Sequence, residues 1–366
     1  MKPASAIATI LGLCLLLAAC NPTEEPTPLD IPIPYGFPSR LNIPDDNPMT
    51  VEGVALGKLL FEDGHLSGYT GSETDSLMSC ADCHRRAHNY DIGLDNPRFP
   101  NGKPHGRTGI YTNHTAMPLC NLVFNHEGYL WNGAVHSSNS AGKRQIEDIV
   151  RAAITAEDEI GSSEARTLEA LRRDSRYPEL FKKAFGSEEI TMDRVEKAIA
   201  QYVRSLVSGN AKFDRYLQGN ELLTPQELHG LVLFTTEEGA DCFHCHGSGG
   251  SPLFTTNLFY NNGLDATFCD NADRNAVTGY SMDIGAYRAP SLRNIAVSAP
   301  YMHDGRYKTL DEVLTFYNEG LQYSPYVSPL MHKIHEGGRH LSPSDIADLK
   351  AFLLTLTDEE FLFDDR

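Results

Sequence analysis

Two five-residue stretches, Cys80-Ala81-Asp82-Cys83-His84 and Cys242-Phe243-His244-Cys245-His246, decide what this chain folds around. In the pattern Cys-x-x-Cys-His, two thiols add to the vinyl groups of a porphyrin while the adjacent imidazole ligates its iron. A zinc site needs no His after each second Cys, and a dithiol redox motif does not predict a second copy. We therefore expect two covalently bound haems c. The expected attachment residues are Cys80, Cys83, Cys242 and Cys245, and the expected proximal iron ligands are His84 and His246.

The residues around the two motifs indicate a duplicated fold. A Gly-x-x-Leu-Phe stretch precedes each motif, at 57–61 and at 230–234. Apolar residues at helical spacing from Val195 to Leu206 predict a helix that Thr191 caps and Gly209 stops. Another helix is predicted from Ser342-Pro343 to about Leu356. The stretches 89–121 and 247–287 show no periodicity and are typical of loops that surround prosthetic groups. We predict a mainly α fold with little β-structure, made of two cytochrome c-like haem domains over 46–209 and 210–366.

The N-terminal residues indicate export. The apolar run Ile7 to Ala19 is too short to span a membrane and ends in Leu17-Ala18-Ala19-Cys20. This ending resembles the lipobox of bacterial lipoproteins, and an ordinary secretory signal is the alternative. We predict a signal peptide over 1–19, lipidated Cys20, and a flexible Pro-, Thr- and Glu-rich tether over 20–45. The body would then lie at the periplasmic face of a bacterial membrane, held by lipid alone.

The sequence argues against two classes of protein, those that span a membrane and those that bind nucleic acid. No later segment offers the roughly 20 apolar residues of a transmembrane helix. The net charge of -18 argues against a nucleic-acid partner, because such partners require clustered Lys and Arg. An acidic surface can steer a basic redox partner, although many solvated proteins are acidic.

Several longer segments show what the motifs belong to. They are Leu56 to Phe61, Leu130-Trp131-Asn132-Gly133, Ala289 to Ala296, and Ala299-Pro300-Tyr301-Met302-His303-Asp304-Gly305. Together with the two motifs, they resemble the bacterial di-haem cytochrome c peroxidases and their MauG-type relatives over most of the chain after the signal. The resemblance implies that the N-terminal haem reacts with hydrogen peroxide. The C-terminal haem would relay electrons from a small protein such as a cytochrome c or a cupredoxin, and a homodimer is one option.

The resemblance also assigns roles around the first haem. Trp131 matches the Trp that lies between the haems in the family, with a plain core Trp as the alternative. Glu159 takes the place of the glutamate that moves protons during peroxide cleavage, and Glu157 is the reserve candidate. His105 lies near the loop whose His caps the first haem in many peroxidases, and His114 competes with it. Asn132, Ala134 and Ala153 depart from the family pattern, which leaves the shape of this site open.

Around the second haem, Tyr317 lies fourteen residues after His303, where peroxidases carry Met and MauG-type proteins carry Tyr. The resemblance therefore implies that Tyr317 is the sixth ligand of the second haem iron, with a buried Tyr unconnected with iron as the alternative. A phenolate stabilises ferric and higher iron, whereas a thioether raises the potential, so Tyr317 favours a MauG-like character. The family's calcium ion would use the carbonyls of Ser298 and Pro300, while Thr115 stands where the family has an Asn ligand. Cys120 and Cys269 remain, and nothing in their spacing shows whether they pair.

Three functions follow from these residues. The leading one is reduction of hydrogen peroxide to water. A second, with the same site but a different donor, is MauG-like oxidation of residues on a partner protein. A third, from another class, is a di-haem electron carrier without catalysis, which would not need a proton-moving glutamate.

Overall fold

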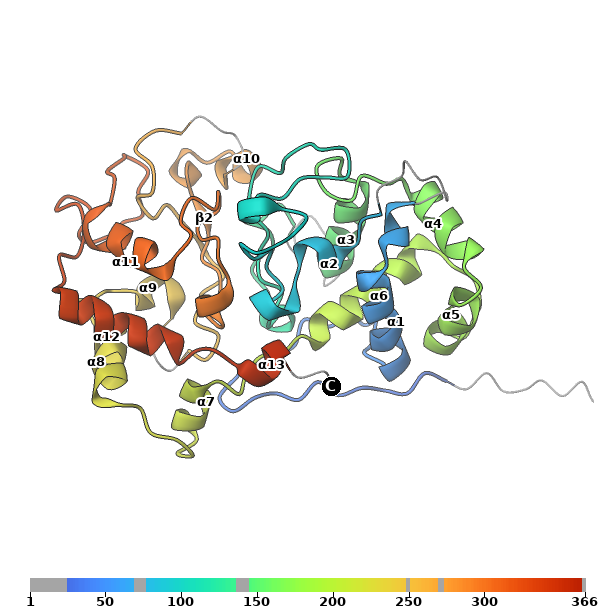
Figure 1. Ribbon diagram of the computed structural model, residues 1–366, viewed down its shortest axis with the longest axis horizontal. Helices are drawn as coiled ribbons and strands as arrows, with labels where there is room; N and C mark the ends of the chain where they lie inside the picture. The colour runs from blue at the N-terminus through green and yellow to red at the C-terminus, as the bar shows by residue number, and fades with distance from the viewer. Residues whose placement is uncertain (1–24, 69–76, 136–144, 248–250, 269–272, 364–366) are drawn as a thin grey trace, which may run out of the picture.

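The computed structural model describes residues 25–68, 77–135, 145–247, 251–268 and 273–363. These ranges form two helical lobes that lie side by side (Figure 1). The first lobe is built from α1 (Val51–Glu62), α2 (Cys80–Cys83), α3 (Gln145–Thr155), α4 (Glu164–Arg173), α5 (Tyr177–Phe185) and α6 (Met192–Ser205). The rest of the chain adds α7 (Lys212–Leu217), α8 (Pro225–Phe234), α9 (Phe243–His246), α10 (Asn275–Thr278), α11 (Leu310–Glu319), α12 (Pro343–Leu354) and α13 (Glu359–Phe363).

Shorter elements fill the loops. They are the 3-10 helices at Gly64–Ser67, Arg86–His88, Pro100–Gly102, Leu122–Phe124, Ser281–Asp283 and Ile295–Val297. Strands β1 (Phe259–Tyr260) and β2 (Tyr287–Arg288) pair antiparallel and form the only sheet in the described ranges. The predicted mainly α fold with little β-structure is confirmed.

Both helices that were predicted from their capping residues are present. The Thr191 side chain accepts a hydrogen bond from Arg194 N at 3.3 Å and begins α6. Ser342 begins α12 with a capping box completed by Asp345. The predicted stop of the first helix at Gly209 is wrong, because α6 ends at Ser205. The buried Leu206 leaves helical geometry there, and its carbonyl accepts a hydrogen bond from Asn121 N at 2.8 Å.

The duplication is visible as two equivalent helix crossings. Helix α1 packs on α6, and α8 packs on α12. Gly57 of α1 lies so close to α6 that an added Cβ would overlap the carbonyl oxygen of Ala198. Gly230 of α8 lies against the carbonyl oxygen of Asp348 in the same way. The glycine of each Gly-x-x-Leu-Phe stretch therefore sets the close approach of two helices beside a haem motif.

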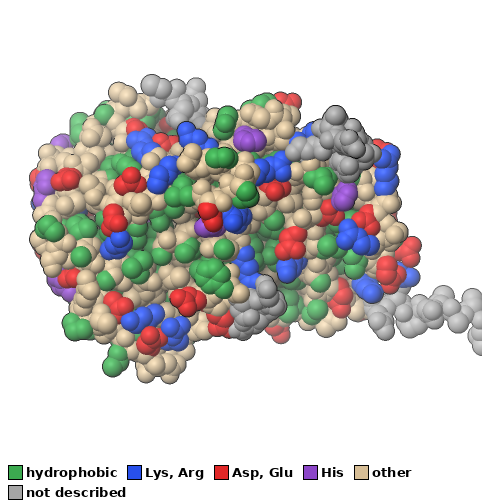
Figure 2. All heavy atoms as spheres, in the orientation of Figure 1, with side chains coloured by type: hydrophobic (Ala, Val, Ile, Leu, Met, Phe, Trp, Pro, Cys, Tyr) green, Lys and Arg blue, Asp and Glu red, His purple; other side chains and the backbone are tan. Residues whose placement is uncertain are grey.

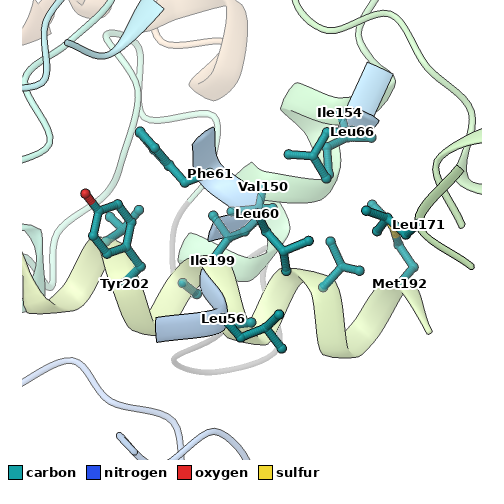
Figure 3. Close-up of a cluster of buried hydrophobic side chains, with 14 of the residues drawn as sticks. Leu56, Leu60, Phe61, Leu66, Val150, Ile154, Leu171, Met192, Ile199 and Tyr202 are labelled. Carbon is teal, nitrogen blue, oxygen red and sulfur yellow. The ribbon is translucent and has the colours of Figure 1, made fainter. Parts of the chain in front are cut away.

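Each lobe has its own core. In the first lobe, Leu56 and Leu60 of α1 face Ile199 of α6, and α3 closes the cluster from above (Figure 3). In the second lobe, rings at positions 213, 234, 254 and 352 pack edge-on or tilted, with centroids 5.4 to 6.1 Å apart. Burial of large side chains such as these contributes roughly 1.5–3 kcal/mol each.

The two lobes also interlock. Asn89 of the first lobe donates to the carbonyl of Arg293 at 3.0 Å, and its own Oδ1 accepts from Asn294 Nδ2 at 3.0 Å. Helix α13 returns to the first lobe, where Arg86 Nε donates to the carbonyl of Phe361 at 2.9 Å. The last turn of the predicted 210–366 domain therefore packs on the other lobe.

The tether predicted over 20–45 is wrong for residues 27–45. Ile31 and Phe37 are buried in a cluster with Val123 and Phe124. Asn42 is also buried, and its Nδ2 donates to the Gln145 side chain at 2.7 Å. The Pro-rich composition predicted a flexible segment, but a few apolar side chains in it pack against the rest of the protein. Residues 1–24, which hold the predicted signal and Cys20, lie outside the described ranges.

Two buried ion pairs reinforce the lobes. Arg204 of α6 and Glu147 of α3 are both 0% exposed, and two hydrogen bonds of 2.7 and 2.8 Å join them. Arg293 and Asp214 form the corresponding pair in the second lobe, with two bonds of 2.7 Å. On the face shown in Figure 2, acidic and basic side chains are interspersed. None of the described helices is long and apolar enough to cross a bilayer.

Candidate haem sites and active site

The first Cys-x-x-Cys-His motif forms one short helix. Asp82 accepts a hydrogen bond from Ser79 N at 2.7 Å at the start of α2, and His84 N donates to the carbonyl of Cys80 at 2.9 Å. The His84 Nδ1 donates to the carbonyl of Tyr90 at 2.7 Å. This bond assigns the proton to Nδ1 and leaves Nε2 as the free lone pair that an iron ligand requires.

The second motif repeats this arrangement. His246 N donates to the carbonyl of Cys242 at 3.0 Å. His246 Nδ1 donates to the carbonyl of Pro290 at 3.1 Å, so Nε2 is again the free nitrogen. Pro290 belongs to the Ala289-to-Ala296 segment, which explains why this segment accompanies the motif.

The surroundings of both motifs suit a porphyrin. Burial raises the pKa of the Cys80, Cys242 and Cys245 thiols to about 12 and raises that of Cys83 as well. Burial also lowers the pKa of His246 to about 4 and lowers that of His84, so both imidazoles are neutral. All six side chains nevertheless remain partly accessible to solvent. These groups are therefore largely surrounded by protein without being sealed from solvent, and the four thiols are unpaired. The residues therefore fit two haems c.

Glu159 lies in the turn that follows α3. Its N–H donates to the carbonyl of Ala156 at 3.1 Å, and its carbonyl accepts from Arg107 N at 3.1 Å. Burial first, and the Asp158 carboxylate second, raise the pKa of Glu159 to about 7. The residue is nevertheless accessible to solvent.

Glu159 lies near the first haem motif. After the larger effect of burial, the Glu159 carboxylate raises the pKa of both the Cys80 and Cys83 thiols. Glu157, the reserve candidate, is exposed, and its carbonyl accepts from Thr108 Oγ1 at 2.9 Å. The structure therefore brings Glu159 to the first motif with a pKa suited to proton exchange near neutral pH.

The two candidate switch histidines lie in different places. The His105 ring packs edge-on against Phe99, 5.0 Å between centroids, and Phe99 clusters with Cys83 of the first motif. The next residue, Gly106, lies against the turn that carries Glu157. His114 instead packs against His303, with centroids 5.7 Å apart. Of the two, His105 borders the first haem motif.

Trp131 lies where the two lobes meet. Its indole Nε1 donates to the carbonyl of Thr115 at 3.0 Å. Its own carbonyl accepts from Arg288 N, on β2 of the second lobe, at 2.7 Å. The indole is therefore bonded to Thr115 of the first lobe, and the Trp131 backbone is bonded to Arg288 of the second lobe.

Tyr317 of α11 faces the second motif. Burial raises its pKa above the ordinary range, and the charges of Cys245 and Cys242 raise it further, which shows that the phenol lies near both thiols. Asn262 Nδ2 donates to the Tyr317 hydroxyl oxygen at 3.0 Å and lies 3.9 Å from Met302 Sδ. Sequence reasoning missed Asn262, because a loop asparagine in Asn261-Asn262-Gly263 carries no periodic or spacing signal.

Two of the residues considered for calcium, Pro300 and Thr115, lie beside the same glycine. A Cβ added at Gly305 would meet both Thr115 and Pro300. Thr115 Oγ1 donates to the carbonyl of Met302 at 3.3 Å, and Ser298 Oγ donates to that of Asn294 at 3.0 Å. Cys120 is buried with a free thiol, whereas Cys269 lies outside the described ranges.

Two haem-attachment motifs on a two-lobed helical scaffold, each with an oriented proximal imidazole, define a di-haem c-type cytochrome. A family model described as di-haem cytochrome c peroxidase matches residues 51–222. The methylamine utilization protein MauG of Methylorubrum extorquens is 34% identical over 88% of this chain and 83% of the relative. Cytochrome-c peroxidase IdrP1 of a Pseudomonas species is 29% identical over 100% of this chain and 95% of the relative.

A solved structure agrees with these relatives. The crystal structure of a MauG-like protein associated with microbial copper homeostasis has a TM-score of 0.78 and 31% identity. The match covers 92% of this chain and 98% of that one. The chain belongs to the di-haem cytochrome c peroxidase family, and it is an oxidoreductase with two haems c.

Proposed function

We propose that the protein reduces hydrogen peroxide to water at the first haem motif, with electrons that enter at the second. The observation that carries this proposal is the Glu159 carboxyl, which faces the first motif with a pKa of about 7. A carrier that only relays electrons has no use for such a group, so this carboxyl counts against the non-catalytic alternative.

The bound haem supplies an iron that exchanges electrons and, with one face open, binds a small oxidant. Reduction of hydrogen peroxide to two waters consumes two electrons and two protons. As a carboxylate, Glu159 accepts a proton from one peroxide oxygen at its Oε. It then returns that proton to the departing oxygen, which would otherwise leave as an unstable anion. The Arg107 and Ala156 contacts of its backbone hold the carboxyl in place for both transfers.

We also propose that Trp131 provides the short path between the two haem sites. Its contacts with Thr115 and Arg288 support this role, because they attach this residue to both lobes. We propose that His105 caps the first haem until the second haem is reduced, since its ring borders the first motif.

A second candidate, MauG-like oxidation of a partner protein, is favoured by one observation. The Tyr317 phenol, with Asn262 donating to its oxygen, faces the second motif where a peroxidase would carry Met. A hydrogen bond to that oxygen stabilises the phenolate form, which favours oxidised iron over electron entry. Both candidates share Glu159 and differ in the source of electrons.

Stopped-flow mixing of the holoprotein with hydrogen peroxide separates the candidates. With a reduced cytochrome c or cupredoxin present, a peroxidase oxidises many equivalents of donor at a steady rate. A MauG-like protein instead shows a long-lived change in its haem spectrum and little donor turnover. Two haems that stay low-spin and six-coordinate after half-reduction, with no reaction with peroxide, would leave only the carrier.

Two further proposals concern the surroundings of the site. The sequence supports export and lipid attachment at Cys20 on the periplasmic face. Membrane fractionation of cells that express the wild type or Cys20→Ala tests this, with release of the variant expected. The resemblance at Ser298 and Pro300, and the closeness of Pro300 to Thr115, support a calcium ion, which metal analysis of the dialysed holoprotein tests.

A further inference from the structure

A cluster of ligand-type atoms lies beside the second motif and takes no part in the function proposed above. His244 Nδ1 is 2.6 Å from Asp241 Oδ1, and His332 Nδ1 is 3.1 Å from Asp241 Oδ2. One ligand atom from each of the three residues lies within 4.8 Å of the others. His244 is a variable position of the motif, whereas His332 comes from the loop between α11 and α12.

We propose that Asp241, His244 and His332 form a binding site for a divalent transition metal, with Zn²⁺ as the best fit. Two imidazoles and one carboxylate with water in the fourth position are a common zinc set, and Ca²⁺ or Mg²⁺ prefers oxygen ligands alone. Zn–N distances of ~2.0–2.1 Å put tetrahedral ligands about 3.3 Å apart. The His244–Asp241 pair therefore needs to open by less than about 1 Å.

The groups around the cluster favour this use. Asp241 is 5% exposed and is therefore held in one place. Glu237 Oε1 lies 3.6 Å from Nε2 of His244, on the ring nitrogen that faces away from Asp241. Metal-bound histidines usually donate this second N–H to a carboxylate, which fixes the tautomer and strengthens the ligand. The His332 side chain is 41% exposed, so an ion can reach the cluster from solvent.

One neighbour opposes the cation. Arg339 Nη1 lies 3.4 Å from Asp241 Oδ2, and its charge lowers the affinity that the three ligands alone would give. The Arg339 side chain donates through Nε to the carbonyl of Gly239 at 2.8 Å. The backbone N–H of Arg339 donates to the carbonyl of Tyr317 at 3.2 Å. An ion on His332 would therefore clamp this loop, which also contacts Tyr317, onto the second motif.

The experiment is a calorimetric titration of untagged, chelator-treated holoprotein with Zn²⁺, followed by metal analysis after desalting. We expect one retained equivalent and a raised melting temperature, because an ion that binds only the folded state stabilises it. His332→Ala should weaken this binding roughly 100-fold or more, since even outer-shell changes cost 10–100-fold. The matched control is His335→Ala, an exposed histidine in the same loop that is not part of the cluster, and it should bind as the wild type does.

A calcium competition and a second variant complete the test. Excess Ca²⁺ should leave zinc binding unchanged, which separates this site from the proposed calcium site. If His332→Ala alters the haem spectrum or unfolds, His244→Gln provides the second test, with covalent haem content as its folding check. Absence of a retained equivalent in the wild type, or equal affinity in the variants and the wild type, would overturn the proposal.

Discussion

The replacement of Glu159 by Gln is the sharpest test of the proposed chemistry. Gln keeps the shape and volume of the side chain but can neither accept nor release a proton. Loss of a positioned acid–base group costs about 100-fold or more in rate. We therefore expect Glu159→Gln to react with hydrogen peroxide at least about 100-fold more slowly than the wild type.

The same residue predicts a pH profile. Because burial raises the pKa of Glu159 to about 7, its carboxylate is the minor form below that pH and the major form above it. The carboxylate is the form that accepts the first proton. The wild-type rate with peroxide should thus rise about tenfold from about pH 6 to about pH 8 and then level off. Glu159→Gln should lose this rise.

The assay is single-turnover stopped flow with peroxide, monitored by haem absorbance across this pH range. Glu157→Gln is the matched control, because that exposed carboxyl is only two residues away. It should keep both the wild-type rate and the pH profile. A Glu159→Gln protein with an unchanged rate would remove this residue from the mechanism, and loss of activity in Glu157→Gln alone would transfer the role to Glu157.

Three further predictions concern the scaffold and the second haem. Arg204→Met leaves the buried Glu147 carboxylate without its cationic partner, so the free energy of unfolding should fall by about 3–5 kcal/mol in denaturant titrations. The exposed Arg173–Glu169 pair is its control, and Arg173→Met should cost less than about 1 kcal/mol; equal losses would refute the argument. Gly57→Ala and Gly230→Ala should each lower the free energy of unfolding by about 1–3 kcal/mol or more, because a Cβ there overlaps the facing helix backbone. A thermal melt unchanged from the wild type would contradict this. Tyr317→Met should raise the potential of the second haem in a spectroelectrochemical titration, since a thioether favours ferrous iron more than a phenolate does; an unaltered potential would show that Tyr317 is not a ligand.

The sequence by itself determined the cofactor and the fold class. Each Cys-x-x-Cys-His motif occupies one helical turn, so its chemistry depends on local spacing, which the sequence displays directly. Thr191 and Ser342 began the predicted helices for the same reason, because a helix cap is a contact within three residues. The predicted stop at Gly209 failed where a long-range hydrogen bond from Asn121 held the chain at Leu206.

Only the tertiary structure decided which groups far apart in the sequence lie close together. Glu159 faces Cys80 and Cys83 across nearly eighty residues of chain, and Asn262 reaches Tyr317 across fifty-five. Residues 27–45 pack on the first lobe because a few of their apolar side chains are buried against Val123 and Phe124. Composition alone does not predict such a long-range contact. Local spacing encodes contacts within one turn of helix. The pKa of a buried carboxyl or the partner of a phenol depends instead on atoms that only the folded chain brings close.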